Sequence, residues 1–442
     1  MTRGTLLERT GRPLGDLEKL FWATSLESNI NWVQPIQVSG TVNSGDLREA
    51  LDRLQARHPL LSVSVISDEN SVPHFRSSAN CPVPLRIVNR TNDLTWIGEA
   101  ESEINEPMDP ARPPLLRAVF VQGEQTSEIL LCGTHCNIDG VSIIVIVKDL
   151  LLALAKLPGP PTLPLQLPFE NLFAPLRGSE LPGEWEDNFR RPIEGHSEPK
   201  MEMTNAITEV APPFRIAFWR LDSDHTRKLV ESCRKEGVTM HAAVCAAFLS
   251  AFGKQSQNSD NRFVRCASPI NLREACPPVG EDVGVYISMF VLCMPLDLPT
   301  NIWELARSVR EQLNQAKKMQ NLVTVHTVLR EMMNLPTAKE IVEWSRQAVS
   351  YEFGVTNLGK LPIPSTFGSL RISRLWPPIA VSNPNSDTVA VFTFEDQLTI
   401  TITSKADRQE FGTLAINCLK EMSFVPKSFS FGLPISVNDP DT

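Results

Sequence analysis

The stretch ILLCGTHCNIDGVSIIVIVKDLLLAL, residues 129–154, joins two apolar runs through a short polar loop. The first run, residues 129–132, predicts a buried strand, and the second, residues 141–154, predicts a buried helix because helical propensity and continuous apolarity agree there. Asp139 stands at the N-cap of this helix, where its carboxylate can accept hydrogen bonds from the first helical amides. The stretch therefore predicts a strand, a loop that carries His135, and a helix.

His135 has two interpretations at this point. In the structural one, Asp139 caps the helix, Gly140 relieves crowding and His135 fills the turn. In the functional one, His135 lies where a strand ends and a helix begins, a place where side chains face a cleft in α/β proteins. Imidazole has an ordinary pKa of about 6.5, which suits the removal of a proton at neutral pH. The residues of the loop leave both interpretations open.

The composition is that of an ordinary globular protein. The chain has 442 residues, enough for two or three domains, of which 42% are hydrophobic and 21% charged. The formal charge of −9 gives no reason to expect nucleic acid, which needs a clustered basic surface. The N-terminus lacks the apolar segment of a signal peptide, and residues 141–154 are shorter than a membrane span and contain Lys148 and Asp149. We expect a cytoplasmic monomer without a membrane span.

Three common kinds of site are not indicated by the sequence. The nine cysteines are scattered, and Cys132, His135 and Cys136 lack the second ligand pair of a structural zinc site, so we expect free thiols and no metal. The G-x-S-x-G elbow of serine hydrolases does not occur. Both kinds of glycine-rich phosphate loop are also missing, which argues against nucleotide hydrolysis and dinucleotide chemistry.

Helix and strand patterns alternate along the first half of the chain. Helices are expected around residues 17–24, 47–54 and 141–154, and strands around residues 36–42, 61–65, 115–121 and 129–132. From residue 158 to residue 213 prolines recur and periodicity is lost, which indicates a crossover linker. The predicted organisation is an N-terminal lobe of residues 1–157, a linker of residues 158–213, and a C-terminal lobe of residues 214–442.

The second half also mixes helices and strands. Strands are expected at residues 214–221, 262–268, 284–294, 389–394 and 398–403, and helices at residues 223–237, 239–252, 303–318 and 407–422. The predicted fold class is therefore α/β (α+β). A cleft between the two lobes is the default place for a site.

The loop resembles a known acyltransferase motif. The segment from His135 to Gly140 is similar to the HxxxDG motif of the superfamily that includes chloramphenicol acetyltransferase, alcohol O-acetyltransferases, plant BAHD enzymes and the condensation domains of peptide synthetases. Other stretches resemble this superfamily in the expected order: LREALDRLQARHPLL (47–61), PPLLRAVFV (113–121), VTMHAAVCAAFLSAF (238–252), SPINLRE (268–274), GVYISMF (284–290) and FGVTNLGKL (353–361). The resemblance covers most of the chain and implies a two-lobed fold with a tunnel between the lobes.

The resemblance also implies a role for individual residues. His135 would be the general base that removes a proton from the acceptor as it attacks a thioester carbonyl. Asp139 would be structural, turned away from the substrate and paired with Arg273, and Gly140 would leave room in the tunnel. Asn357 would lie near the substrate, although a turn residue before Gly359 is an equally good interpretation of Asn357.

Two departures from the superfamily pattern indicate which branch of the superfamily this chain resembles most. Many relatives have a second histidine where this chain has Thr134, and the plant-type DFGWG segment is missing, its nearest counterpart being residues 352–356. Both departures place the chain nearest the stand-alone alcohol O-acetyltransferases.

The expected function is that of this branch. It is the transfer of an acetyl or other short acyl group from coenzyme A to a hydroxyl of a small secondary metabolite, with acyl-CoA as co-substrate and no bound cofactor. The alternatives are a donor on a carrier protein, as in condensation-like or polyketide-releasing enzymes, a cyclase or isomerase that uses the same tunnel, and binding without catalysis.

Overall fold

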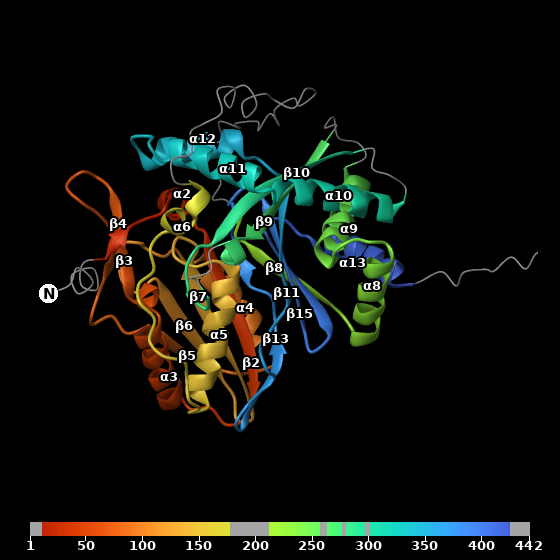
Figure 1. Ribbon diagram of the computed structural model, residues 1–442. Helices are drawn as coiled ribbons and strands as arrows, with labels where there is room; N and C mark the ends of the chain where they lie inside the picture. The colour runs from red at the N-terminus through yellow and green to blue at the C-terminus, as the bar shows by residue number, and fades with distance from the viewer. Residues whose placement is uncertain (1–10, 177–211, 257–262, 276–279, 297–300, 425–442) are drawn as a thin grey trace, which may run out of the picture.

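The computed structural model describes residues 11–176, 212–256, 263–275, 280–296 and 301–424. Two large β-sheets lie side by side, each with helices packed against it (Figure 1). A third, three-stranded sheet lies at the edge of the molecule, with the order β1-β4-β3. Its strands are β1 (Arg12–Pro13), β4 (Pro73–Ser77) and β3 (Val63–Ser67).

The first large sheet has the order β12-β13-β2-β7-β6-β5, with β14 also paired to β2. Its strands are β2 (Asn31–Ser39), β5 (Leu85–Asn89), β6 (Leu116–Gln122), β7 (Thr126–Thr134), β12 (Thr366–Phe367), β13 (Leu370–Leu375) and β14 (Ile379–Ala380). Apolar side chains on one face pack against α3 (Ser44–Arg57) and α5 (Gly140–Leu154), and those on the other face pack against α4 (Thr95–Asn105). Since both faces are covered, the central strands are apolar along most of their length.

The second large sheet has the order β10-β9-β11-β15-β16-β8. Its strands are β8 (Arg215–Leu221), β9 (Phe263–Asn271), β10 (Ile287–Pro295), β11 (Phe353–Lys360), β15 (Asp387–Phe394) and β16 (Gln397–Ser404). The helices α8 (Ser223–Lys235), α9 (Met240–Gln255), α10 (Ile302–Ala316) and α13 (Gln409–Ser423) share a core with it. The helix α9 is central to this core, because its residues 242–249 are all buried.

A smaller group of helices lies between the sheets. Helix α2 (Asp16–Glu27), from the start of the described chain, packs against α11 (Met319–Met332) and α12 (Ala338–Ala348). The shared core contains Leu17 of α2, Leu329 and Met332 of α11, and Ile341 of α12. Two short elements, α6 (Phe169–Leu172) and η2 (Ala174–Leu176), pack beside α11.

The predicted helices and strands are all present in the structure, with shifted ends. The predicted strand of residues 36–42 ends at Ser39, and the predicted strand of residues 284–294 begins only at Ile287, because the residues before it bond to another part of the chain. Helices α4, α11 and α12 were not predicted. The α/β (α+β) class predicted from the sequence is confirmed.

The two sheets do not divide the chain where the predicted lobes divide it. Strands β12, β13 and β14 come from the predicted C-terminal lobe of residues 214–442, yet β13 and β14 pair with β2 of the first sheet. Without β13 and β14, the N–H and C=O groups along one edge of β2 would be unpaired, which favours this pairing across the two halves of the chain. Of the predicted linker, residues 158–213, residues 177–211 lie outside the described residues.

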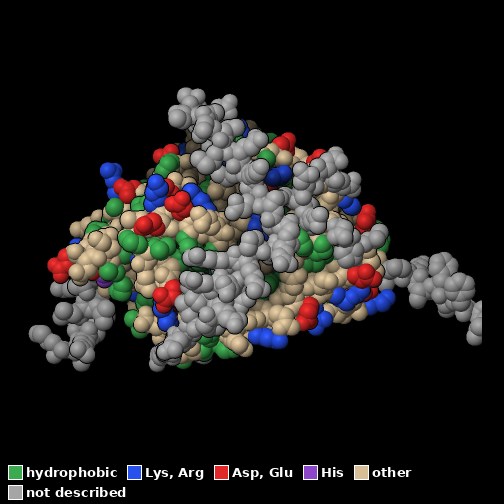
Figure 2. All heavy atoms as spheres, turned by 90° about the horizontal axis from the view of Figure 1, so that it is seen from above, with side chains coloured by type: hydrophobic (Ala, Val, Ile, Leu, Met, Phe, Trp, Pro, Cys, Tyr) green, Lys and Arg blue, Asp and Glu red, His purple; other side chains and the backbone are tan. Residues whose placement is uncertain are grey.

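One face of the surface and the apolar helices were compared with what a binding patch or a membrane span would need. Acidic and basic side chains are interspersed on the face seen in Figure 2. Within the described ranges, no single helix has the length and apolarity of a membrane span, and α8 and α9 reach them only together, across a bend of 101°.

Candidate functional site

His135 lies in the loop between β7 and α5, as the sequence predicts. The end of β7 at Thr134 and the N-cap of α5 at Asp139 fix both ends of this loop. The backbone N–H of His135 donates to the carbonyl oxygen of Ile30 at 3.2 Å, and its ring lies 5.8 Å from the ring of Phe21. The imidazole is thereby held between the first sheet and α2.

The two ring nitrogens of His135 have different surroundings. Nδ1 lies 3.2 Å from the carbonyl oxygen of Ile138. A carbonyl oxygen only accepts, so Nδ1 carries the proton of the neutral ring and Nε2 keeps its lone pair. Among the described residues Nε2 has no hydrogen-bond partner. Burial lowers the pKa of His135 below its ordinary value, although the Ile138 carbonyl and the Asp139 carboxylate act in the opposite direction. The imidazole is therefore a neutral base at pH 7.

Asp139 is buried and forms the predicted ion pair with Arg273. Arg273 Nη1 lies 2.8 Å from Asp139 Oδ2, and Arg273 Nη2 donates to Asp139 Oδ1 at 3.0 Å, a bidentate arrangement. The backbone N–H groups of Ser142 and Tyr286 donate to the same carboxylate at 2.8 and 3.0 Å. Burial alone would raise the pKa of Asp139, but Arg273 and these amides outweigh it and hold the pKa below its usual range.

A second set of bonds joins the loop to the segment before β10. The Asp139 N–H donates to the Gly284 carbonyl oxygen at 3.0 Å, and the Ser142 hydroxyl donates to the same oxygen at 2.9 Å. The Gly284 N–H and Arg273 Nη2 donate in turn to the Ser142 hydroxyl, at 3.0 and 2.8 Å. Gly284 and Tyr286 were not predicted as site residues, because backbone partners leave no side-chain signal in a sequence.

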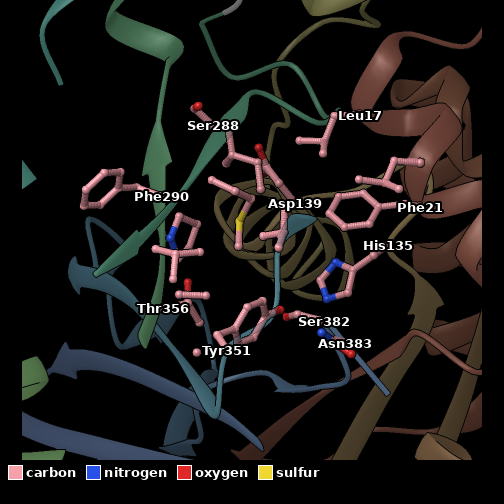
Figure 3. Close-up of a pocket in the computed structure, with 18 of the residues that line it drawn as sticks. Leu17, Phe21, His135, Asp139, Ser288, Phe290, Tyr351, Thr356, Ser382 and Asn383 are labelled. Carbon is pink, nitrogen blue, oxygen red and sulfur yellow. The ribbon is translucent and has the colours of Figure 1, made fainter. Parts of the chain in front are cut away.

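A cavity of about 460 Å³ opens beside His135. Its wall comes from both sheets and from α2, α11 and α12, and most of the lining side chains are apolar. Figure 3 shows His135 and Phe21 on one side of the cavity and Phe290 of β10 on the opposite side. Hydroxyl and amide groups also line it, among them Ser288, Thr356, Ser382 and Asn383. The cavity can hold an apolar molecule that carries a few polar groups.

Gly140 and Asn357 both line this cavity. A Cβ atom on Gly140 would lie 3.0 Å from Cδ2 of Leu358, so a larger residue there needs Leu358 to move. Asn357 Oδ1 accepts a hydrogen bond from the N–H of Gly359 at 2.8 Å, and Gly359 has a φ of +72°. Both interpretations of Asn357 therefore agree with the structure, since this residue shapes a turn and also faces the cavity.

The structure brings together residues that are far apart in the sequence. His135, Gly140 and Asn357 line one cavity, and Arg273 holds the loop of His135 through Asp139. The contributions of α2, α11 and α12 to the wall were not predicted. Their apolar stripes resemble those of any core helix, so no local pattern distinguished them as part of a site.

A metal site, or a nucleophilic thiol beside His135, has little support within the part of the chain that the structure describes. No cluster of three or more His, Cys, Asp or Glu side chains there is suited to hold a metal ion. The cysteines of these residues, including Cys132 and Cys136 next to the loop, are free thiols. Burial raises the pKa of Cys136 to about 12, so this thiol is not a nucleophile at neutral pH.

Comparison with known proteins identifies the fold. Residues 211–403 match the family described as phthiocerol/phthiodiolone dimycocerosyl transferase C-terminus. Polyketide synthase associated protein 5 from Mycobacterium tuberculosis is 17% identical, with a TM-score of 0.68 over 94% of this chain and 97% of that chain. The first condensation domain of the CDA synthetase is 15% identical, with a TM-score of 0.67 over 94% and 96% of the two chains. The chain has the two-lobed fold of condensation domains and chloramphenicol acetyltransferase-like proteins.

Proteins with this fold include an acetyltransferase, and the curated relatives in sequence are large synthetases. TRI3 trichothecene 15-O-acetyltransferase from Fusarium sporotrichioides is 12% identical, with a TM-score of 0.70 over 93% of this chain and 94% of that chain. Malformin synthetase from Aspergillus niger is 27% identical over 133 residues, which are 29% of this chain and 3% of that protein. The chain therefore spans only a few per cent of the length of such curated relatives.

Proposed function

We propose that this protein is an acyltransferase that moves a short acyl group from coenzyme A to a hydroxyl of an apolar small molecule. His135 is the general base, and acyl-CoA is a co-substrate rather than a bound cofactor. The observation that carries this proposal is the unpartnered Nε2 of a neutral His135 on the wall of a cavity of about 460 Å³, among the described residues.

In the proposed reaction the imidazole of His135 first accepts a proton and later donates it. Nε2 removes the hydroxyl proton of the acceptor while the acceptor oxygen forms a bond to the thioester carbonyl carbon. The resulting tetrahedral intermediate collapses, the carbon–sulfur bond breaks, and the imidazolium returns its proton to the departing thiolate. General base catalysis of this kind contributes about two to four orders of magnitude, and the alignment of two substrates in one cavity contributes more.

Asp139 acts through position rather than by touching the substrate. Its carboxylate is occupied by Arg273, Ser142 and Tyr286, so it has little capacity left for another donor. As the N-cap of α5 it fixes the end of the loop, four residues beyond His135. The direction of the imidazole therefore depends on the ion pair.

The names of the relatives support acyl transfer to oxygen. The matched family is described as a dimycocerosyl transferase, and one structural neighbour is described as a 15-O-acetyltransferase. The apolar wall of the cavity fits an apolar acceptor, because burial of apolar surface is favourable by roughly 25 cal/mol per Å².

A donor on a carrier protein is the second candidate. It is favoured by the curated relatives, which are peptide synthetases such as a linear gramicidin synthase from Brevibacillus parabrevis, and by the structural similarity to a condensation domain. Assays with acetyl-CoA and with the same acyl group on a carrier protein separate the two donors, because the true donor gives the higher kcat/KM.

The direct test is product analysis by mass spectrometry. The protein is incubated with acetyl-CoA and an extract of hydroxylated metabolites, and we expect acylated products that His135→Ala reduces at least about 100-fold. Circular dichroism and the Tm of the variant control for folding. Full turnover by a folded His135→Ala would instead support a cyclase or isomerase, and ligand binding without product under either donor would support a binding protein.

A further inference from the structure

A second histidine lies on the wall of the same cavity. His326 is on α11 and is 1% exposed. The ring of Phe169 lies 4.8 Å from its ring, and the ring of Phe173 lies 6.5 Å away. Its neighbours on α11, Val325 and Leu329, also line the cavity. His326 is thus a polar group in an otherwise apolar part of the wall.

Neither ring nitrogen of His326 has a hydrogen-bond partner among the described residues. Burial lowers the pKa of His326 to about 4, and the nearby positive charge of Arg330 acts in the same direction. The ring is therefore neutral at pH 7 and offers one N–H donor and one lone pair. A buried polar group without a partner costs free energy, and most buried polar groups in proteins are paired.

His58 is the matched comparison in the same chain. It is also 1% exposed, but its Nε2 lies 2.8 Å from Oδ2 of Asp149, which joins α5 to the end of α3. His58 therefore has a partner for one of its two ring nitrogens, whereas His326 has none for either among the described residues. His326 lies in the wall of the cavity instead, with both ring nitrogens covered, and a ligand that displaces the covering atoms can supply the partner.

The two histidines come from different elements that line the cavity. His135 comes from the loop after β7 and lies against Phe21 of α2, whereas His326 is carried by α11 and lies against Phe169. Under the proposed function a short acyl group fills only a small part of a volume of about 460 Å³. The acceptor and the end of the donor chain share the rest of the cavity, and in this proposal the acceptor is the molecule that reaches His326.

We propose that His326 binds a second oxygen of the acceptor. This inference rests on the proposed function and specifies its substrate class. The acceptor is an apolar compound with at least two oxygen functions: one hydroxyl that is acylated at His135, and a second hydroxyl or carbonyl that bonds to His326 and stays free. His326 would then decide which hydroxyl reaches the base, because a site built to bond an oxygen discriminates strongly against analogues that lack it.

The first test uses stability and needs no ligand or turnover. His326→Leu keeps the approximate volume of the side chain and removes the unpaired nitrogens, so we expect the Tm of the full chain to rise by about 2 °C or more. His58→Leu, the matched control, should lower the Tm because it removes a partner of Asp149. A Tm below that of the wild type, or failure of His326→Leu to fold, overturns the proposal, since the imidazole would then have a structural partner.

The second test uses binding without an acyl donor. Calorimetry compares α,ω-diols of about six to twelve carbons with primary alcohols of the same length. In the wild type we expect one length at which the diol binds about 5–10-fold more tightly than the alcohol, as one additional buried hydrogen bond would give. In His326→Leu this preference should disappear. A wild type without such a length, or a preference that survives in His326→Leu, overturns the proposal. Failure of the proposed acyltransferase function would give a different result from failure of the His326 proposal. In that case the diols would bind as expected, but acetyl-CoA would give no product.

Discussion

Asp139 and Arg273 are the residues whose contacts make the site a single unit. One comes from the first half of the chain and the other from the second, and Arg273 also lies over the ring of Tyr286, 4.9 Å from its centroid. The side chain of Asp139 is fully buried and that of Arg273 is 10% exposed, so loss of either partner leaves an uncompensated buried charge.

We therefore predict that Asp139→Ala and Arg273→Ala each lower the free energy of unfolding by about 3–5 kcal/mol. The double variant should be destabilised by less than the sum of the two single variants, because each substitution removes the charge that the other leaves unpaired. Urea denaturation of the three variants measures this. The exposed pair of Asp224 and Arg227 is the control, and Arg227→Ala should change stability by no more than about 0.5 kcal/mol. Unchanged unfolding of both site variants would contradict a structural ion pair.

The pKa of His135 gives a prediction for the pH dependence of the rate. Burial lowers this pKa below the ordinary 6.5, so at a given acidic pH more of the ring stays neutral than in a free imidazole. We expect kcat/KM to fall as the pH drops through a midpoint below 6.5 and to reach a plateau about one pH unit above that midpoint. Stability should change in the same direction, because the unfolded chain binds this proton more readily than the folded one. An acid limb with its midpoint at about pH 7 or above would show that His135 is not the base.

At the scale of elements, the contact between the start of α5 and β11 sets the width of the cavity. Gly140 opens α5, and Leu358 of β11 lies against it. The Cβ of any larger residue at position 140 would meet Leu358 Cδ2 at 3.0 Å, which is closer than most such contacts. The glycine is therefore a packing requirement between two elements, and its φ is not in the left-handed region.

We predict that Gly140→Val lowers stability by about 1–3 kcal/mol through this overpacking, and that it raises KM for the acceptor because Leu358 is pushed into the cavity. Adding Leu358→Ala should restore at least half of the lost stability, since it removes the atom that clashes. The Tm and KM of the two single variants and the double variant measure this. If Gly140→Val lowered stability equally in the wild-type and Leu358→Ala backgrounds, the clash with Leu358 would not be the cause.

At the scale of the whole molecule, the two halves of the chain share both a sheet and a site. Strands β13 and β14 complete the first sheet, although they come from the second half. The loop of His135 is held by Arg273, Gly284 and Tyr286, which also come from the second half. The first half by itself would lack these partners.

We therefore predict that residues 1–213 do not fold when expressed without residues 214–442. The first sheet would expose the edge of β2, and Asp139 would be a buried carboxylate without its arginine. Co-expression of both fragments should restore a folded complex that elutes at the size of the whole chain. A cooperative thermal transition of the isolated first fragment as a monomer would show instead that the predicted N-terminal lobe is an independent domain.

Local patterns in the sequence predicted a large part of this fold. The predicted helices and strands depended on periodicity within about twenty residues, and the capping residue Asp139 marked the start of α5. The resemblance to HxxxDG proteins supplied the two-lobed fold and the pairing of Asp139 with Arg273. Helices α4, α11 and α12 were missed because their apolar stripes are short or broken by polar residues.

The sequence by itself determined the strand, the loop and the helix around His135, because each depends on neighbours a few residues away. Only the tertiary structure decided that β12 to β14 cross to the first sheet, since edge strands select partners by hydrogen bonding and not by position in the chain. It also decided which nitrogen of His135 is free among the described residues and that His326 lies in the wall of the same cavity. Both depend on burial and on contacts between distant residues, which no local pattern records.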